Sequence, residues 1–190
     1  MVKVAILHEG TKNDKTADKK LLKSLIQKLG LPENDIIFDA FGSKNEFFKL
    51  DNPKYLRLKE FVEAGQIDKV LFVVDADYEE DDAKYKGFEN TERELKNIIS
   101  ELGFEGIARF YIVCDPETKT GYLESLILAS LSKDKKNCID CFVKCSEINP
   151  KKIHKTIINE LYSIAYPDPP YNFDHPNFEL LKIELIKLFN

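Results

Sequence analysis

The sequence predicts an α/β fold, in which a small parallel sheet of about four strands is flanked by helices. Short apolar runs alternate with segments whose apolar residues recur every three or four positions, as expected for strands that alternate with helices. Residues 70–74 are five consecutive apolar residues, which is typical of a strand buried on both faces of a parallel sheet. Right-handed connections between such strands place helices on both faces of the sheet.

The elements are expected in the order strand, helix, strand, helix, strand, helix, strand, and then helices only. The strands are predicted at residues 2–7, 35–41, 69–77 and 107–115. Helical periodicity lies between them, at residues 21–29, 55–62 and 95–102. Each of these helices ends near a glycine, as helices often do, namely Gly30, Gly65 and Gly103. Either Asp14 or Asp18 is expected to cap the first helix.

The remainder of the chain is expected to be helical. Further helical segments are predicted at residues 122–131, 138–145 and 153–164. A proline-rich loop follows at residues 166–176, and Pro176 can begin a last helix. The apolar face of this last helix consists of Phe178, Leu181, Leu185 and Leu188. We therefore predict an α/β core over residues 1–132 and a helical C-terminal extension over residues 133–190, packed on the core.

Composition excludes several classes of protein. The 190 residues are 43% apolar and 32% charged, which is typical of a globular chain. No apolar run approaches the ~20 residues that span a bilayer, and the short apolar N-terminus does not resemble a signal peptide, so a cytoplasmic protein without membrane association is expected. The net charge of −5 argues against binding nucleic acid by bulk charge, although a bound cation can supply local positive charge.

Acidic residues follow three of the predicted strands. Glu9 follows the first strand, Asp75 and Asp77 end the third, and Asp115 ends the fourth. Because parallel strands present their carboxyl ends at one edge, these carboxylates are expected to meet there, and Mg²⁺ would relieve their repulsion. On an extended strand Asp75 and Asp77 would share one side. Gly10, directly after Glu9, permits a tight turn beside this cluster.

Other interpretations of these acids remain open. Aspartate is common at strand ends because it favours turns and helix caps, and a single Asp-x-Asp pair is a weak metal motif. Residues 75–87 are also compatible with a solvated acidic loop. An EF-hand is excluded, because Glu80 stands where that loop requires glycine. A phosphatase of the Asp-x-Asp type is disfavoured, because its nucleophile lies on the first strand rather than the third.

Four segments resemble a known family. ILHEG at residues 6–10 and VVDAD at residues 73–77 look like the two acidic motifs of a Toprim domain, which occurs in topoisomerases, bacterial primases and the OLD (overcoming lysogenization defect) nucleases. GYLESLIL at residues 121–128 and NFDHPNFELLKIELIKLF at residues 172–189 are similar to segments of a stand-alone, Toprim-related bacterial family near the OLD nucleases. The resemblance covers nearly the whole chain.

The resemblance implies a mechanism and a set of ligands. Glu9 would be the general acid/base or a metal ligand, and Asp75 and Asp77 would coordinate Mg²⁺, or Mn²⁺ in its place. Candidate accessory residues are Gly10, Asp14, Asp18, Asp115, Glu124 and Lys155, with Lys151 and Lys152 as alternatives to Lys155. The implied activity is Mg²⁺-dependent cleavage of nucleic-acid phosphodiesters. The alternative is a non-catalytic nucleotide- or nucleic-acid-binding module, or a partner protein of a defence or repair system, and a homodimer is compatible with either.

Two further features have competing interpretations. Cys138, Cys141 and Cys145 have spacing that would suit zinc with Cys114 or His154 as fourth ligand, but their apolar neighbours favour simple packing. His8 is expected to be packed rather than catalytic. The aromatic residues Tyr162, Tyr166, Tyr171 and Phe173 could stack on single-stranded nucleic acid, although fastening the last helix to the core is the favoured interpretation.

Overall fold

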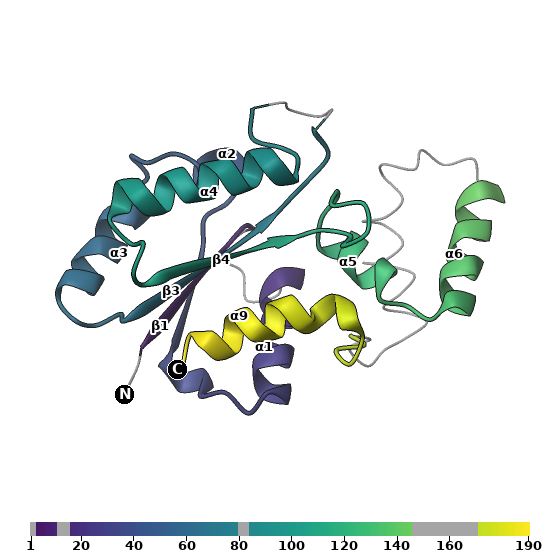
Figure 1. Ribbon diagram of the computed structural model, residues 1–190, viewed down its shortest axis with the longest axis horizontal. Helices are drawn as coiled ribbons and strands as arrows, with labels where there is room; N and C mark the ends of the chain where they lie inside the picture. The colour runs from purple at the N-terminus through teal and green to yellow at the C-terminus, as the bar shows by residue number, and fades with distance from the viewer. Residues whose placement is uncertain (1–2, 11–15, 80–83, 146–170) are drawn as a thin grey trace.

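The computed structural model describes residues 3–10, 16–79, 84–145 and 171–190 (Figure 1). Its centre is a four-stranded, all-parallel sheet in the order β2-β1-β3-β4. The strands are β1 (Val4–His8), β2 (Ile36–Ala40), β3 (Lys69–Asp75) and β4 (Ala108–Val113). Helices flank this sheet, so the predicted α/β fold is confirmed.

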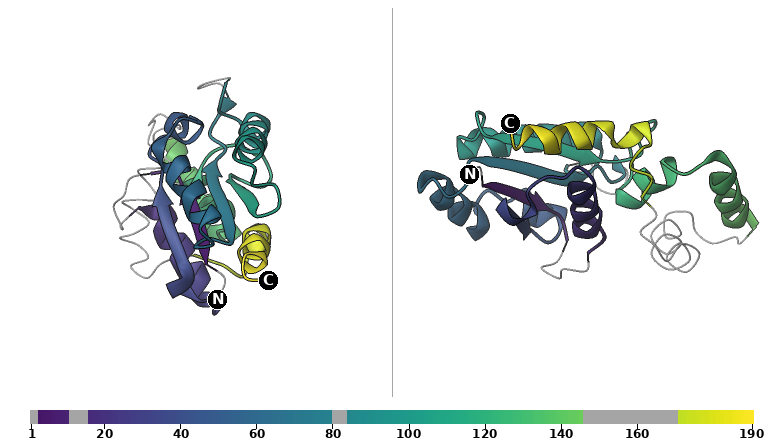
Figure 2. Two further views of the ribbon diagram at one scale, coloured as in Figure 1. Left: turned by 90° about the vertical axis from the view of Figure 1, so that its left-hand side faces the viewer. Right: turned by 90° about the horizontal axis from the view of Figure 1, so that it is seen from below.

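Helices cover both faces of the sheet, which forms the middle layer of three (Figures 1 and 2). One face carries α1 (Ala17–Lys28) and α9 (Glu179–Lys187), and the other carries α2 (Lys44–Phe47), α3 (Pro53–Glu63) and α4 (Phe88–Leu102). The short elements η1 (Glu33–Asp35) and η4 (Pro176–Phe178) precede β2 and α9, and α5 (Leu123–Ala129) and α6 (Lys133–Cys145) follow β4.

The continuous apolar run of the central strands follows from this layering. Along β1, Val4 and Ile6 face the core beneath α1 and α9, whereas Ala5 and Leu7 face the core beneath α3 and α4. All four side chains are buried. A strand covered on one face only would instead alternate apolar with polar residues.

The last helix belongs to the same core as the sheet. Phe178, Leu181, Leu185 and Leu188 are all buried beside β4 and α1, as the predicted apolar face requires. The guanidinium of Arg109 on β4 forms a bidentate ion pair with Glu184, with 3.0 Å between Arg109 Nη2 and Glu184 Oε1. In contrast, α6 is mostly exposed and extends away from the sheet (Figure 1).

Several predicted boundaries differ from the structure. The third strand ends at Asp75, two residues early, and α2 has no counterpart among the predicted elements. Asp18 does not cap α1 as predicted, because Thr16 is the N-cap residue and Asp18 lies in the first turn. The other candidate, Asp14, lies outside the described residues. The predicted helix at residues 153–164, together with Tyr162 and Tyr166, lies outside the described residues. In the described part of the chain, no helix has the length and apolar character needed to cross a membrane.

Candidate functional site

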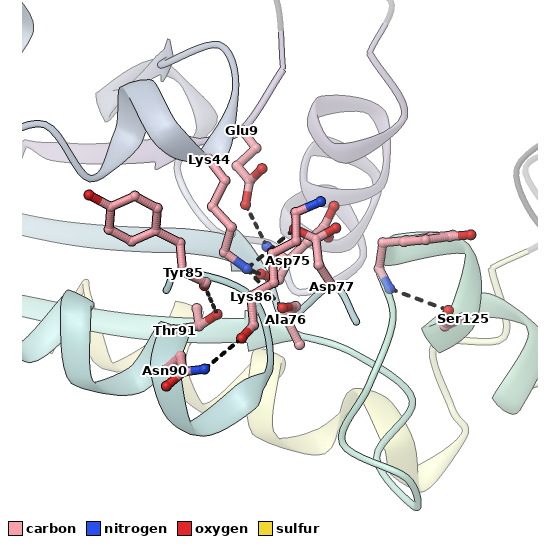
Figure 3. A network of polar contacts seen from close by, with 11 residues as sticks. Glu9, Lys44, Asp75, Ala76, Asp77, Tyr85, Lys86, Asn90, Thr91 and Ser125 are labelled. Carbon is pink, nitrogen blue, oxygen red and sulfur yellow. Dashed lines mark hydrogen bonds and ion pairs between the residues drawn. The ribbon is translucent and has the colours of Figure 1, made fainter. Parts of the chain in front are cut away.

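The candidate site lies at the carboxyl ends of β1 and β3, which are neighbours in the sheet. Glu9 follows β1 directly, and Asp75 is the last residue of β3. The backbone N–H of Asp75 donates to Glu9 Oε1 at 3.0 Å, so the two strand ends are joined by a side chain of the site itself (Figure 3). The structure thus joins Glu9 and Asp75, two of the four acids that were expected to meet at this edge.

The backbone conformation of Asp77 differs from the extended strand that was expected. Its φ of 59° lies in the left-handed region, which is uncommon for residues other than glycine. Two backbone hydrogen bonds to Gly121 hold it there: Asp77 N–H donates to Gly121 O at 2.7 Å, and Gly121 N–H donates to Asp77 O at 3.1 Å. The prediction that Asp75 and Asp77 share one side of an extended strand is therefore wrong, because β3 ends at Asp75 and the backbone of Asp77 is not extended.

Gly121 is required for this turn. Its φ is 90°, and a Cβ at this position would lie 2.2 Å from Ser125 Oγ and 2.8 Å from Ser125 Cβ. Such separations are far below van der Waals contact, so a side chain here would displace the start of α5. The loop before α5 thereby fixes the position of Asp77.

Lys44 is the residue of the site that the strand-end argument missed. It is the first residue of α2 and only 4% exposed. Its ammonium donates to the carbonyl oxygen of Asp75 and, at 2.8 Å, to that of Ala76, and it lies 3.4 Å from Asp77 Oδ2 (Figure 3). A signal was available in the sequence: Ser43 and Glu46 have the spacing of a helix N-terminus, at the edge of the sheet where the acids gather.

The segment before α2 is fixed to the segment after β1. Gly10 and Gly42 exchange two backbone hydrogen bonds of 2.8 Å each. Gly10 has a φ of 105°, which explains why glycine suits this position. Because Glu9 and Lys44 lie within two residues of this bridge, it sets their separation.

The electrostatics of the site are dominated by burial and by repulsion between carboxylates. Asp75 Oδ1 is buried and, in the part of the chain that the structure describes, has no hydrogen-bond partner. Burial, followed by the negative charges of Asp18, Glu9, Asp77 and Glu124, raises the pKa of Asp75 well above its usual range. Burial likewise raises the pKa of Glu9 to about 7, against the opposing charge of Lys44.

The pKa of Lys44 shifts in the opposite direction for the same reason. Burial disfavours its charged form and lowers its pKa, while Asp77 and Glu9 oppose the shift. Asp77, Glu9 and Asp75 therefore act on this buried ammonium, while Asp18 and Glu124 act on Asp75 from other parts of the chain.

The accessory candidates separate into three groups. Asp18 and the buried Glu124 both act electrostatically on Asp75, so they belong to the surroundings of the site. Asp115 instead forms a turn, in which its Oδ1 accepts a hydrogen bond of 2.9 Å from the N–H of Glu117. The third group, Asp14, Lys151, Lys152 and Lys155, lies outside the described residues.

The other features assessed from the sequence contribute no side chain to the acidic cluster described above. His8 is buried, and its Nδ1 is 2.6 Å from Glu9 O, consistent with the predicted packed histidine. Cys138, Cys141 and Cys145 are exposed on α6, whereas Cys114 is buried in the core beneath α4. His154 lies outside the described residues.

The described residues of the site do not form a fully ligated metal centre. Within the described ranges, no group of three or more His, Cys, Asp or Glu side chains is arranged so that it could hold a metal ion. The position between Asp77 and the end of β3 is taken by the Lys44 ammonium. However, carboxylates are the donors that Mg²⁺ prefers, and it often uses only one or two of them. The buried Asp75 Oδ1 also lacks a hydrogen-bond partner within the described ranges. We conclude that Asp75, with Glu9 or Asp77, could hold such an ion through few direct contacts.

Comparison with models of known protein families finds no match to this chain, and a search of curated proteins finds none with significant similarity.

Proposed function

We propose that this protein is a Mg²⁺-dependent, Toprim-like enzyme that cleaves phosphodiester bonds in nucleic acid. One observation supports this most strongly: Glu9 and Asp75 meet at adjacent strand ends, and the buried Asp75 Oδ1 has no hydrogen-bond partner among the described residues. A buried polar atom without a hydrogen bond is costly, so its persistence favours a ligand that interacts with it. The carboxyl edge of an open α/β sheet is also where such folds bind ligands.

The residues of the site have complementary roles in this proposal. A divalent cation would supply charge neutralisation at the phosphate. Asp75 and Asp77 would hold that ion, while Lys44 holds the turn that carries them. Glu9, with its pKa raised to about 7, is suited to gain or lose a proton near neutral pH at the attacking or leaving oxygen.

The experiment is a cleavage assay with the full chain and matched variants. Supercoiled DNA, single-stranded DNA and single-stranded RNA are incubated with the protein and Mg²⁺ or Mn²⁺. We expect cleavage of at least one substrate, abolished by EDTA and reduced at least a hundredfold by Glu9→Gln. Glu60→Gln, an exposed change on α3, is the control and should cleave like the parent. Activity that survives Glu9→Gln would refute the assignment.

A non-catalytic role is the second candidate, and the Lys44 contact favours it. Because Lys44 already supplies a positive charge to Asp77, part of the acidic charge is balanced without a metal. Such a site could bind a nucleotide or nucleic acid without cleaving it, alone or as part of a defence or repair system. Calorimetry with Mg²⁺ and nucleotides distinguishes the two candidates: binding without any cleavage supports the module.

A further inference from the structure

All three hydrogen atoms of the Lys44 ammonium have acceptors at the end of β3. A lysine ammonium has three donors and no acceptor. Here they match three oxygens: the carbonyls of Asp75 and Ala76 and the carboxylate of Asp77. In this arrangement Lys44 has no donor left for a substrate, so its role is to position other groups.

Several contacts fix the position of α2 and therefore of Lys44. The Gly10–Gly42 bridge fixes the chain just before α2, and Ser43 Oγ accepts from the N–H of Glu46 to cap that helix. At the other end of α2, Phe47 is fully buried, and Phe47 O accepts a hydrogen bond of 2.5 Å from the hydroxyl of Tyr55. A lysine that merely covered a surface would not need such anchoring.

Charge explains why the ammonium is buried at this point. A charged group away from water is tolerated only when it is paired and hydrogen-bonded. The acids at the strand ends have the converse need, because buried carboxylates repel one another unless a cation lies among them. The carboxylates therefore stabilise the buried ammonium, and the ammonium reduces the repulsion between the carboxylates.

We propose that Lys44 is the resident cation of the acidic site, a positioning residue that holds the turn from Asp75 to Asp77 and competes with a divalent cation for its carboxylates. The inference rests on the proposed function in that it concerns the same site. It adds a regulatory property: Lys44 keeps the site folded without metal and sets the divalent affinity lower than the carboxylates alone would give.

The test is a titration of Mg²⁺ and Mn²⁺ chlorides, without substrate, into the full chain and two variants. Lys44→Met removes the buried charge and keeps much of the side-chain length. Lys49→Met removes an exposed charge only a few residues away, where Lys49 pairs with Glu46 at the surface, and is the matched control. Calorimetry gives the affinity for the ion, and thermal unfolding is followed with and without the ion.

We expect Lys44→Met to bind the divalent cation at least tenfold more tightly than the parent, because one adjacent unit charge changes the affinity for a doubly charged ion by about that much even in a water-like medium. Without the cation this variant should melt at a lower temperature than the parent, and adding Mg²⁺ should restore most of the difference. Lys49→Met should match the parent in both measurements.

Other results would overturn the inference. Affinity that is unchanged or weaker in Lys44→Met would show that the lysine does not compete with the ion, and a melting temperature that Mg²⁺ does not restore would leave it an ordinary structural lysine. If Lys44→Met does not fold, Lys44→Met combined with Asp77→Asn decides: the inference requires the double variant to be more stable than the single one, since it removes the unpaired carboxylate.

The proposed function is tested separately, by the cleavage assay. Cleavage by the parent protein and its loss in Glu9→Gln do not depend on how Lys44 acts. If neither the parent nor Lys44→Met binds a divalent cation, the inference fails and the proposed Mg²⁺-dependent mechanism fails with it. If both bind with equal affinity, the inference alone fails.

Discussion

Replacing Gly121 with alanine should destabilise the protein through one identifiable contact. Two costs add at this position. An alanine forced to a φ of 90° costs roughly 1–2 kcal/mol. Its Cβ would also lie 2.2 Å from Ser125 Oγ and 2.8 Å from Ser125 Cβ, and relieving such an overlap by moving the backbone costs about 1–3 kcal/mol. We therefore expect a loss of about 2–5 kcal/mol.

Two other glycines separate these contributions. Gly30 has a similar left-handed conformation, with a φ of 66°, but a Cβ there meets no atom within 4 Å, so Gly30→Ala should lose only the conformational part, roughly 1–2 kcal/mol. At Gly106 neither cost applies, and Gly106→Ala should be neutral or stabilising by up to about 1 kcal/mol. The assay is urea unfolding followed by circular dichroism. A Gly121→Ala protein as stable as Gly106→Ala would refute the account of the Asp77 turn.

Two further predictions concern the acids and the last helix. The folded state raises the pKa of Glu9 to about 7 from an ordinary value of 4.5, so the folded protein binds that proton more tightly than the unfolded chain. This group therefore lowers the free energy of unfolding as pH rises from about 4.5 to 7, by up to about 3 kcal/mol. Urea unfolding measured at pH 5 and pH 8 should show that the stability of Glu9→Gln, relative to the parent, is higher at pH 8 than at pH 5. The same difference in free energy of unfolding at both pH values would contradict the raised pKa. In α9, Leu185→Ala removes a fully buried side chain and should cost about 2–5 kcal/mol, whereas Leu180→Ala, at a side chain 68% exposed, should cost less than about 0.5 kcal/mol. Equal losses for the two leucines would mean that α9 does not pack on the sheet as described.

The fold was predictable because its signals are local and repeated. Burial on both faces makes β3 a continuous apolar run, and Gly103 adopts the left-handed conformation expected just after a helix. The periodicity of the last segment identified the buried face of α9, including Leu185. These features depend on spacing along the chain, which the sequence displays directly.

The candidate site was predictable only where it follows from strand order. Glu9 and Asp75 meet because β1 and β3 are adjacent and parallel. Lys44 was missed because α2 is a single turn, too short for periodicity, and its contacts join residues more than thirty positions apart. Asp115 was misplaced for the opposite reason: its local preference for a turn prevails over its place at a strand end.

The central claim is that the acids at the ends of β1 and β3 form a cation site. The most direct test is calorimetric titration of Mn²⁺ into the parent protein, Asp75→Asn and Asp115→Asn. We expect the parent and Asp115→Asn to bind with similar affinity, and the affinity of Asp75→Asn to be at least tenfold lower. Equal binding by the parent and Asp75→Asn, or a loss seen only with Asp115→Asn, would contradict it.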